Sequence, residues 1–145
     1  MWPLGWTMQT VLYGIPAKYT TRIQRIQNTL ACVVAGDRIP CSNLDTFSQL
    51  HWLQVHDRTE FKIATMTHTG NPPYLANLVQ WHTPRRTLRS ASTNLLSVSL
   101  CDISFGARGF RSAAPAIWNS PPSNVRSYET LTTFRQHLHS AFATA

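Results

Sequence analysis

The amino-acid sequence predicts a small, mainly α-helical domain with room for one short β-hairpin near residues 95–105. The chain has 145 residues, 43% of them hydrophobic, which is enough for one real core and too little for two large ones. Apolar residues recur at three- and four-residue steps in several segments, and glycines and prolines separate these segments. We therefore expect an irregular lead-in over residues 1–10 and a single helical domain over residues 11–145.

The first strong helical pattern begins at Tyr19. Its apolar residues follow helical spacing: Ile23, Ile26, Leu30, Val33 and Val34. Thr20 or Thr21 can cap the start of this helix, and Gly36 is placed to end it. The prolines and glycines of residues 1–16 indicate an irregular segment before it.

Further helices are expected in the middle of the chain. Residues 42–53 have room for a short one, and a longer one is predicted over residues 57–67. Glu60 follows Asp57 by three positions, an arrangement that resembles a capping box, and Gly70 with the prolines behind it stops the helix. Another short helix is expected after these prolines, carrying Tyr74, Leu75 and Leu78.

The next part of the chain is less regular. Residues 81–92 carry three arginines and little apolar content, so we expect an exposed basic loop there. Short extended segments are predicted at 95–100 and 103–105. A helix over residues 109–119 would bury several apolar side chains, with Pro115 as an awkward interior residue.

The last helix has the clearest pattern in the chain. Ser127 is the expected cap, and Glu129 suits the positive end of the helix dipole. Its apolar residues fall on one face: Leu131, Phe134, Leu138 and Phe142. We expect this face to pack in a core.

The composition is strongly basic, which makes an RNA or DNA backbone the leading expected partner. Lysine and arginine number 13 against 6 acidic residues, giving a formal charge of +7 at pH 7. Nearly all of these cations are arginines, whose guanidinium groups can grip phosphate bidentately and stack on bases. Ordinary solvated surface would give the same count. The candidate contacts are Arg22, Arg25, Arg85, Arg86, Arg89, Arg108 and Arg111.

We expect no catalytic residue, metal site or cofactor. Polymerase chemistry needs carboxylates that hold two metal ions, yet no two aspartates are adjacent and only Asp57 and Glu60 are close in sequence. The three cysteines and six histidines match no common zinc spacing, and no phosphate-binding glycine motif occurs. With no signal peptide or long apolar run, no membrane partner is expected and the default location is cytoplasm or nucleus.

Short motifs follow one another along most of the chain. They are LYGIP at 12–16, RIQRIQN at 22–28, LHWL at 50–53, DR at 57–58, FKIA at 61–64, PPYL at 72–75, LRS at 88–90, FGARGF at 105–110, APAIWNS at 114–120 and TFR at 133–135. In this order they resemble the thumb and post-palm region of reverse transcriptases from non-LTR retrotransposons, the LINE-type elements. Each motif alone is weak, whereas their order over residues 11–142 is a strong signal.

The resemblance implies a fragment without catalysis. In that family the catalytic aspartates belong to the palm, upstream of the part resembled here, and the thumb lies against the template and primer duplex. From this resemblance we expect the chain to have a basic, helical surface that binds nucleic acid. Two alternatives stay open: a protein-interaction module with Trp52, Trp81 and Trp118 at a partner interface, or a transposon-derived remnant without a selected function.

The basic loop gives the first testable prediction. If Arg85, Arg86 and Arg89 contact phosphates, replacing all three with Ala should weaken binding equally for all sequences, because phosphate contacts do not read bases. The slope of log affinity against log salt should fall by roughly 2 to 3, at about 0.9 for each duplex phosphate. Anisotropy titrations with two unrelated duplexes at several salt concentrations measure both effects. An unchanged slope would assign these arginines to solvated surface.

Overall fold

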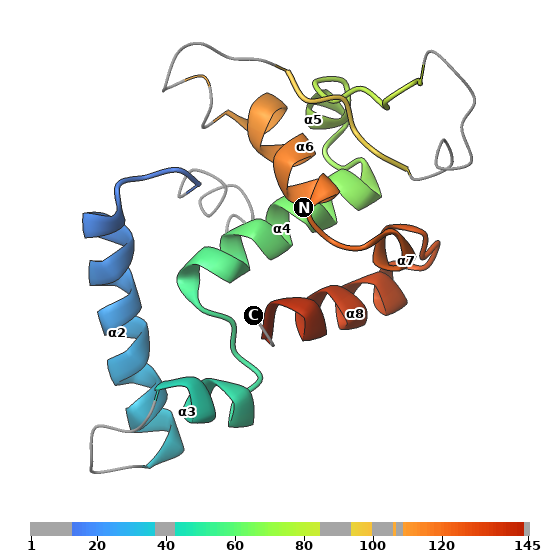
Figure 1. The fold of residues 1–145 in the computed structure, drawn as a ribbon. Helices are drawn as coiled ribbons and strands as arrows, with labels where there is room; N and C mark the ends of the chain where they lie inside the picture. Colours follow the sequence, from blue (N-terminus) through green and yellow to red (C-terminus); the bar gives the residue numbers. More distant parts are fainter. Residues whose placement is uncertain (1–12, 37–42, 85–93, 100–105, 107–108, 144–145) are drawn as a thin grey trace.

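The computed structural model describes residues 13–36, 43–84, 94–99, 106 and 109–143. As predicted, they are mainly helical. Seven helices lie within them (Figure 1): α2 (Ala17–Ala35), α3 (Asn43–Gln49), α4 (Val55–Thr69), α5 (Pro73–Ala76), α6 (Phe110–Asn119), α7 (Ser123–Arg126) and α8 (Leu131–Ala143). No helix in this part of the chain is both long enough and apolar enough to cross a membrane.

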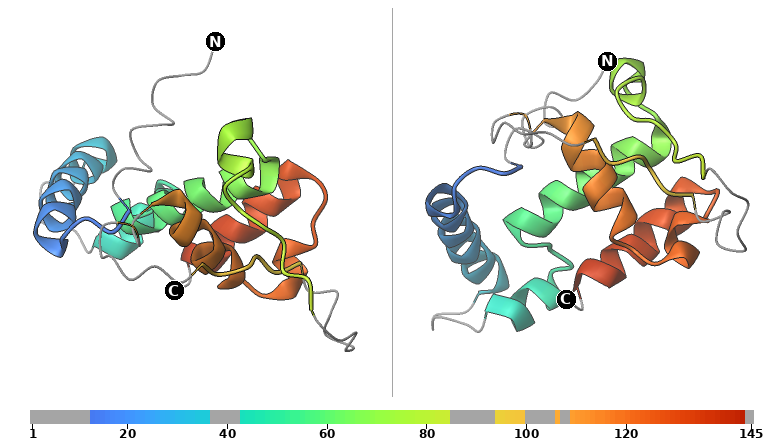
Figure 2. Two further views of the ribbon diagram at one scale, coloured as in Figure 1. Left: turned by 90° about the horizontal axis from the view of Figure 1, so that it is seen from above. Right: turned by 45° about the horizontal axis from the view of Figure 1, so that its top comes forward.

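Helix α4 lies at the centre of the arrangement (Figure 1). α6 and α8 both pack against it, and α7 packs against α8. α2 and α3 contact each other, and α2 also contacts α4. In the view from above, α2 stands at one edge, away from α6 and α8 (Figure 2). The buried core belongs to the α4, α6 and α8 side: Ile63, Ala64, Leu96, Ala113, Ala114, Ile117, Trp118, Val125, Phe134 and Leu138.

The middle of α4 is buried around its whole circumference. Five successive residues, 63–67, are all buried, and two of them are threonines. The hydroxyls of Thr65 and Thr67 donate to the carbonyl oxygens of Phe61 and Ile63, one turn earlier in the same helix, at 2.7 and 2.8 Å. Because these polar groups are satisfied within the helix, their burial carries no unpaired donor.

Residues 94–96 form hydrogen bonds with the C-terminal end of α6. The Trp118 indole Nε1 donates to the carbonyl oxygen of Asn94 at 2.8 Å. The Asn119 side chain both donates to the carbonyl oxygen of Leu96 and accepts from its amide, each at 3.0 Å. Leu96 is thereby held in the core with 1% of its surface exposed.

Only the first half of the hairpin expected near residues 95–105 falls on described residues, and it pairs with a segment outside that hairpin. Leu96 makes an isolated antiparallel bridge with Trp81, which precedes the basic loop, and the described residues 95–99 form no strand. Backbone hydrogen bonds from His82 to Leu95 and from Ser97 to Gln80 flank the bridge. Residues 100–105, the other half of the expected hairpin, lie outside the described residues.

An aromatic cluster joins the three central helices. The His68 ring of α4 stacks on the Phe134 ring of α8, with centroids 4.3 Å apart, and the Trp118 ring of α6 lies 5.7 Å from Phe134. His68 Nε2 also lies 2.8 Å from the carbonyl oxygen of Tyr128, just before α8. Phe134 and Leu138 are 1% and 0% exposed, which confirms the face predicted for the last helix. Trp118 is a core residue, not an interface residue.

Two predicted helix ends are confirmed, and they belong to glycines. Gly36 ends α2 with φ of 76°, and Gly70 ends α4 with φ of 62°. Both values are left-handed, a conformation that glycine adopts without the strain a Cβ would add.

The predicted starts of three helices are wrong by two or more residues. α2 begins at Ala17, and the hydroxyls of Thr20 and Thr21 donate back to the carbonyl oxygen of Ala17 instead of capping. α4 begins at Val55, so Asp57 lies inside its first turn and makes no capping box. Ser127 does not cap α8 but follows α7, where its hydroxyl donates to the carbonyl oxygen of Asn124.

Helix α2 turns most of its apolar residues toward solvent and not toward the core. An apolar stripe on an amphipathic helix ordinarily faces the core. Here the buried residues of α2 are Gln27 and Ala31, while Ile26, Leu30 and Val33 are 69%, 53% and 72% exposed. Leaving such side chains in water forgoes about 1.5 to 3 kcal/mol for each, relative to full burial.

The packing of α8 yields a stability prediction. Phe134→Ala should lower the free energy of unfolding by about 3 to 5 kcal/mol, because it empties a fully buried site between α4 and α6. Urea unfolding followed by circular dichroism measures this loss. Thr132→Ala, at an exposed position of the same helix, is the control and should change stability by less than about 0.5 kcal/mol. A Phe134→Ala effect below about 1 kcal/mol would mean that α8 is peripheral to the core.

Candidate nucleic-acid interface

Helix α2 carries three cations on one face, which we call the α2 basic stripe: Lys18, Arg22 and Arg25. Their spacing of four and three residues places them one above another along the helix. All three are exposed. The first and last are seven residues apart, so the stripe is about 10 Å long at 1.5 Å per residue.

The α2 basic stripe has no acidic residue on its own helix, over all 19 positions. Among the described residues, no carboxylate pairs with Arg22 or Arg25, and the Lys18 ammonium lies 5.8 Å from the centroid of the Tyr19 ring. These cations are therefore directed to solvent with little internal compensation.

The structure describes three of the seven predicted arginines. It brings Arg22 and Arg25 together on α2, whereas Arg111 is exposed on α6 and belongs to a different helix. The other four lie outside the described residues: Arg85, Arg86, Arg89 and Arg108. Lys18 was not among the predicted contacts. Its position four residues before Arg22 was the signal that could have found it.

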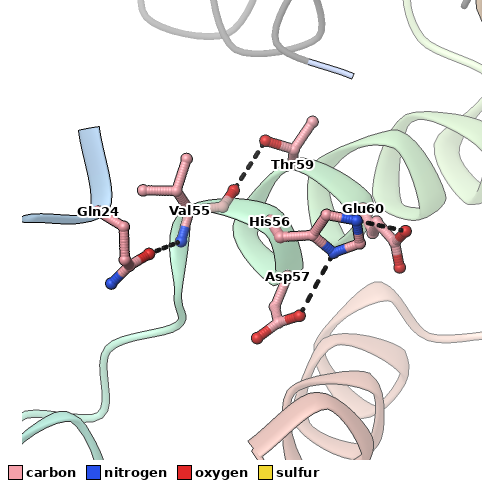
Figure 3. Close-up of polar contacts among 6 residues, drawn as sticks. All are labelled: Gln24, Val55, His56, Asp57, Thr59 and Glu60. Carbon is pink, nitrogen blue, oxygen red and sulfur yellow. Dashed lines mark hydrogen bonds and ion pairs between the residues drawn. The ribbon is translucent and has the colours of Figure 1, made fainter. Parts of the chain in front are cut away.

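The two close acids occupy α4 and contact a histidine between them (Figure 3). His56 Nδ1 lies 3.7 Å from an Asp57 oxygen, and His56 Nε2 lies 3.6 Å from a Glu60 oxygen. Burial raises the pKa of Glu60, His56 lowers it and the Asp57 charge raises it. This arrangement is a local charge cluster at the start of a helix, with the acids near the positive end of the α4 dipole.

Two further histidines, His137 and His139, make contacts within the fold. The His137 ring stacks on Tyr128 with centroids 4.5 Å apart, while His139 Nε2 lies 3.3 Å from the carbonyl oxygen of His51. Within the described ranges, no three or more histidine, cysteine, aspartate or glutamate side chains gather as they would to hold a metal ion. The chemistry that this surface offers is therefore ionic contact.

Two glutamines hold α2 to the start of α4. Gln24 Oε1 accepts the amide hydrogen of Val55, the first residue of α4, at 2.8 Å (Figure 3). Gln27 Nε2 donates to the carbonyl oxygen of Leu53 at 2.9 Å. First-turn amides have no partner inside their own helix, and Gln54 provides no side-chain cap. Gln24 therefore caps the first turn of α4 in place of the expected capping box.

This contact predicts a measurable decrease in stability. Gln24→Leu should cost about 1 to 3 kcal/mol in the free energy of unfolding, because the partly buried Val55 amide loses its acceptor. Gln136→Leu, an exposed glutamine on α8, makes the same chemical change and should be nearly neutral. Urea unfolding of both variants gives the comparison. Equal stabilities would show that Gln24 contributes nothing to the docking of α2.

No protein-family model, no curated protein and no solved structure matches this chain.

Proposed function

We propose that this chain is a non-catalytic, nucleic-acid-binding helical fragment of the kind found in the thumb and post-palm region of non-LTR retrotransposon reverse transcriptases, and that it grips the phosphate backbone through the α2 basic stripe. The single observation behind the proposal is the alignment of Lys18, Arg22 and Arg25 on one exposed face of a helix without acids. The family origin rests on the ordered sequence motifs.

The dimensions of the stripe suit a phosphate backbone. Phosphates of one strand of duplex DNA follow each other at about 3.4 Å along the helix axis, so a stripe of about 10 Å faces up to three of them. Arg22 and Arg25 can each match the bidentate geometry of a phosphate, and Lys18 acts as a point charge. Such contacts position a protein on nucleic acid without reading its bases.

Other cations support the same function. The formal charge of +7 draws a polyanion toward the molecule over distances set by ionic strength. Arg111 on α6 and the arginines of the 81–92 loop are further candidates. We propose the cytoplasm or nucleus as the location of the protein, because nucleic acid is present in both.

The proposal contains no catalytic step. Two-metal phosphoryl transfer needs carboxylates that are open to metal ions and substrate. Asp57 and Glu60 instead contact His56, and no other two acidic residues lie as near to each other along the sequence.

The test is a triple substitution, Lys18→Gln, Arg22→Gln and Arg25→Gln. Glutamine keeps a good helix propensity, so the charge is removed while α2 is retained. The slope of log affinity against log salt for a short duplex should fall by roughly 2 to 3, at about 0.9 for each phosphate that is no longer neutralised. Anisotropy titrations measure the slope, and circular dichroism checks that the helix content is unchanged.

The charge-matched comparison is Arg85→Gln, Arg86→Gln and Arg89→Gln, which removes the other predicted group of phosphate contacts. Each triple variant removes three charges, so general long-range attraction falls equally in the two. If only the loop variant lowers the slope, the α2 basic stripe is solvated surface and the proposal is wrong. If neither the unsubstituted protein nor either variant binds nucleic acid at about 50 mM salt, where phosphate contacts are strong, the proposed function is wrong.

A further inference from the structure

The exposed apolar residues of α2 form a continuous stripe. Their steps alternate between four and three residues, as in the contact seam of a coiled coil: Tyr19, Ile23, Ile26, Leu30 and Val33. Four of the five are 49% to 72% exposed, and only Ile23 is half-buried. The stripe is about 21 Å long, or about four helical turns. A contiguous apolar surface of this kind is typical of a protein contact site.

Part of this stripe forms one wall of a groove of about 620 Å³. Ile23, Ile26 and Leu30 line it from α2. The opposite wall is also largely apolar and includes Trp52, before α4, and Phe61 within α4. The lining is therefore shaped for apolar side chains that enter between α2 and α4.

The groove is also positive. Arg58 and Lys62, one turn apart on α4, line it, and its described lining contains no acidic residue. Burial lowers the pKa of Arg58, and burial together with the Arg58 charge lowers the pKa of Lys62. A carboxylate bound in this groove would raise the pKa of both groups toward its ordinary value, because an opposite charge nearby favours their protonated forms.

We propose that this groove docks an amphipathic helix of a partner protein, with its apolar stripe against Ile26, Leu30 and Phe61 and with acidic side chains directed to Arg58 and Lys62. A helix laid into a groove is a common recognition mode, in which residues at i, i+3, i+4 and i+7 serve as anchors. The acids at the edge of the stripe provide orientation and partner choice.

The charge of the chain disfavours a second copy as the occupant. α2 has no acidic residue, so an α2 from another copy would bring its own cations toward Arg58 and Lys62. Nucleic acid is likewise a poor occupant, because its phosphates would have to leave water between the apolar walls. The α2 basic stripe lies on a different face of the helix, so docking in the groove and phosphate contact are separable.

The experiment uses the full chain and two labelled synthetic helical peptides of about three heptads. Both carry the same leucine stripe; one has glutamates beside it and the other has lysines. By fluorescence anisotropy, the glutamate peptide should bind at least about tenfold more tightly than the lysine peptide, and Arg58→Gln should reduce this preference. Ile26→Ser with Leu30→Ser should weaken glutamate-peptide binding by about tenfold or more.

The matched control is Leu78→Ser with Val98→Ser. These residues are 44% and 57% exposed and lie outside the groove, so their substitution should leave peptide binding unchanged. The proposal is overturned by equal binding of both peptides, by no binding of either at about 1 mM, or by equal effects of the two double variants. It is also overturned if Ile26→Ser with Leu30→Ser abolishes a concentration-dependent dimer in sedimentation, or abolishes nucleic-acid binding, because the occupant is then a second copy or a polynucleotide.

Discussion

The fold depends on a central helix, α4, that is buried on all sides over residues 63–67 although its sequence is rich in threonine. Four threonines of α4 donate their hydroxyls to carbonyl oxygens one turn earlier, at 2.7 to 3.0 Å: Thr59, Thr65, Thr67 and Thr69. These bonds leave methyl groups directed outward, so the surface that α4 offers its neighbours is more apolar than its composition suggests. α6 and α8 can therefore pack on it without stranding a polar group. If these hydroxyls were left unsatisfied, each would cost about 1 to 3 kcal/mol.

A second constraint explains why Trp118 and Asn119 stand together at the end of α6. Trp118 contributes its ring to the cluster with His68 and Phe134, and its indole nitrogen fixes the carbonyl oxygen of Asn94. Asn119 then binds both backbone groups of Leu96, much as a neighbouring strand would. The two residues let an irregular segment enter the core with its backbone hydrogen bonds satisfied. A structural role of this kind is sufficient to account for the motif.

Periodicity predicted the longer helices because each repeats an apolar step over several turns, whereas the single turn of α7 was not predicted. Glycine predicted two helix ends because a left-handed residue is a local requirement. The start of α4 was missed because the group that satisfies it is remote in sequence. Val55 is capped by Gln24, from another helix, and no local pattern can show this. The capping-box spacing of Asp57 and Glu60 instead serves contacts with His56. The bridge between Trp81 and Leu96 is likewise a tertiary pairing across the basic loop.

The candidate site could be anticipated only in part, for a related reason. Helical geometry alone places Arg22 and Arg25 on one face, since they are three residues apart, but it cannot say which face is turned outward. The face of α2 that contacts the start of α4 carries Gln24 and Gln27. These glutamines form hydrogen bonds with backbone groups of Leu53 and Val55, which apolar side chains could not do. That choice leaves two outward surfaces on one helix, a basic stripe and an apolar stripe beside the groove. The stability of this chain alone poorly explains why α2 is held by polar contacts and exposes its apolar residues. A bound partner would bury these apolar side chains and so gain the hydrophobic free energy that the isolated fold lacks.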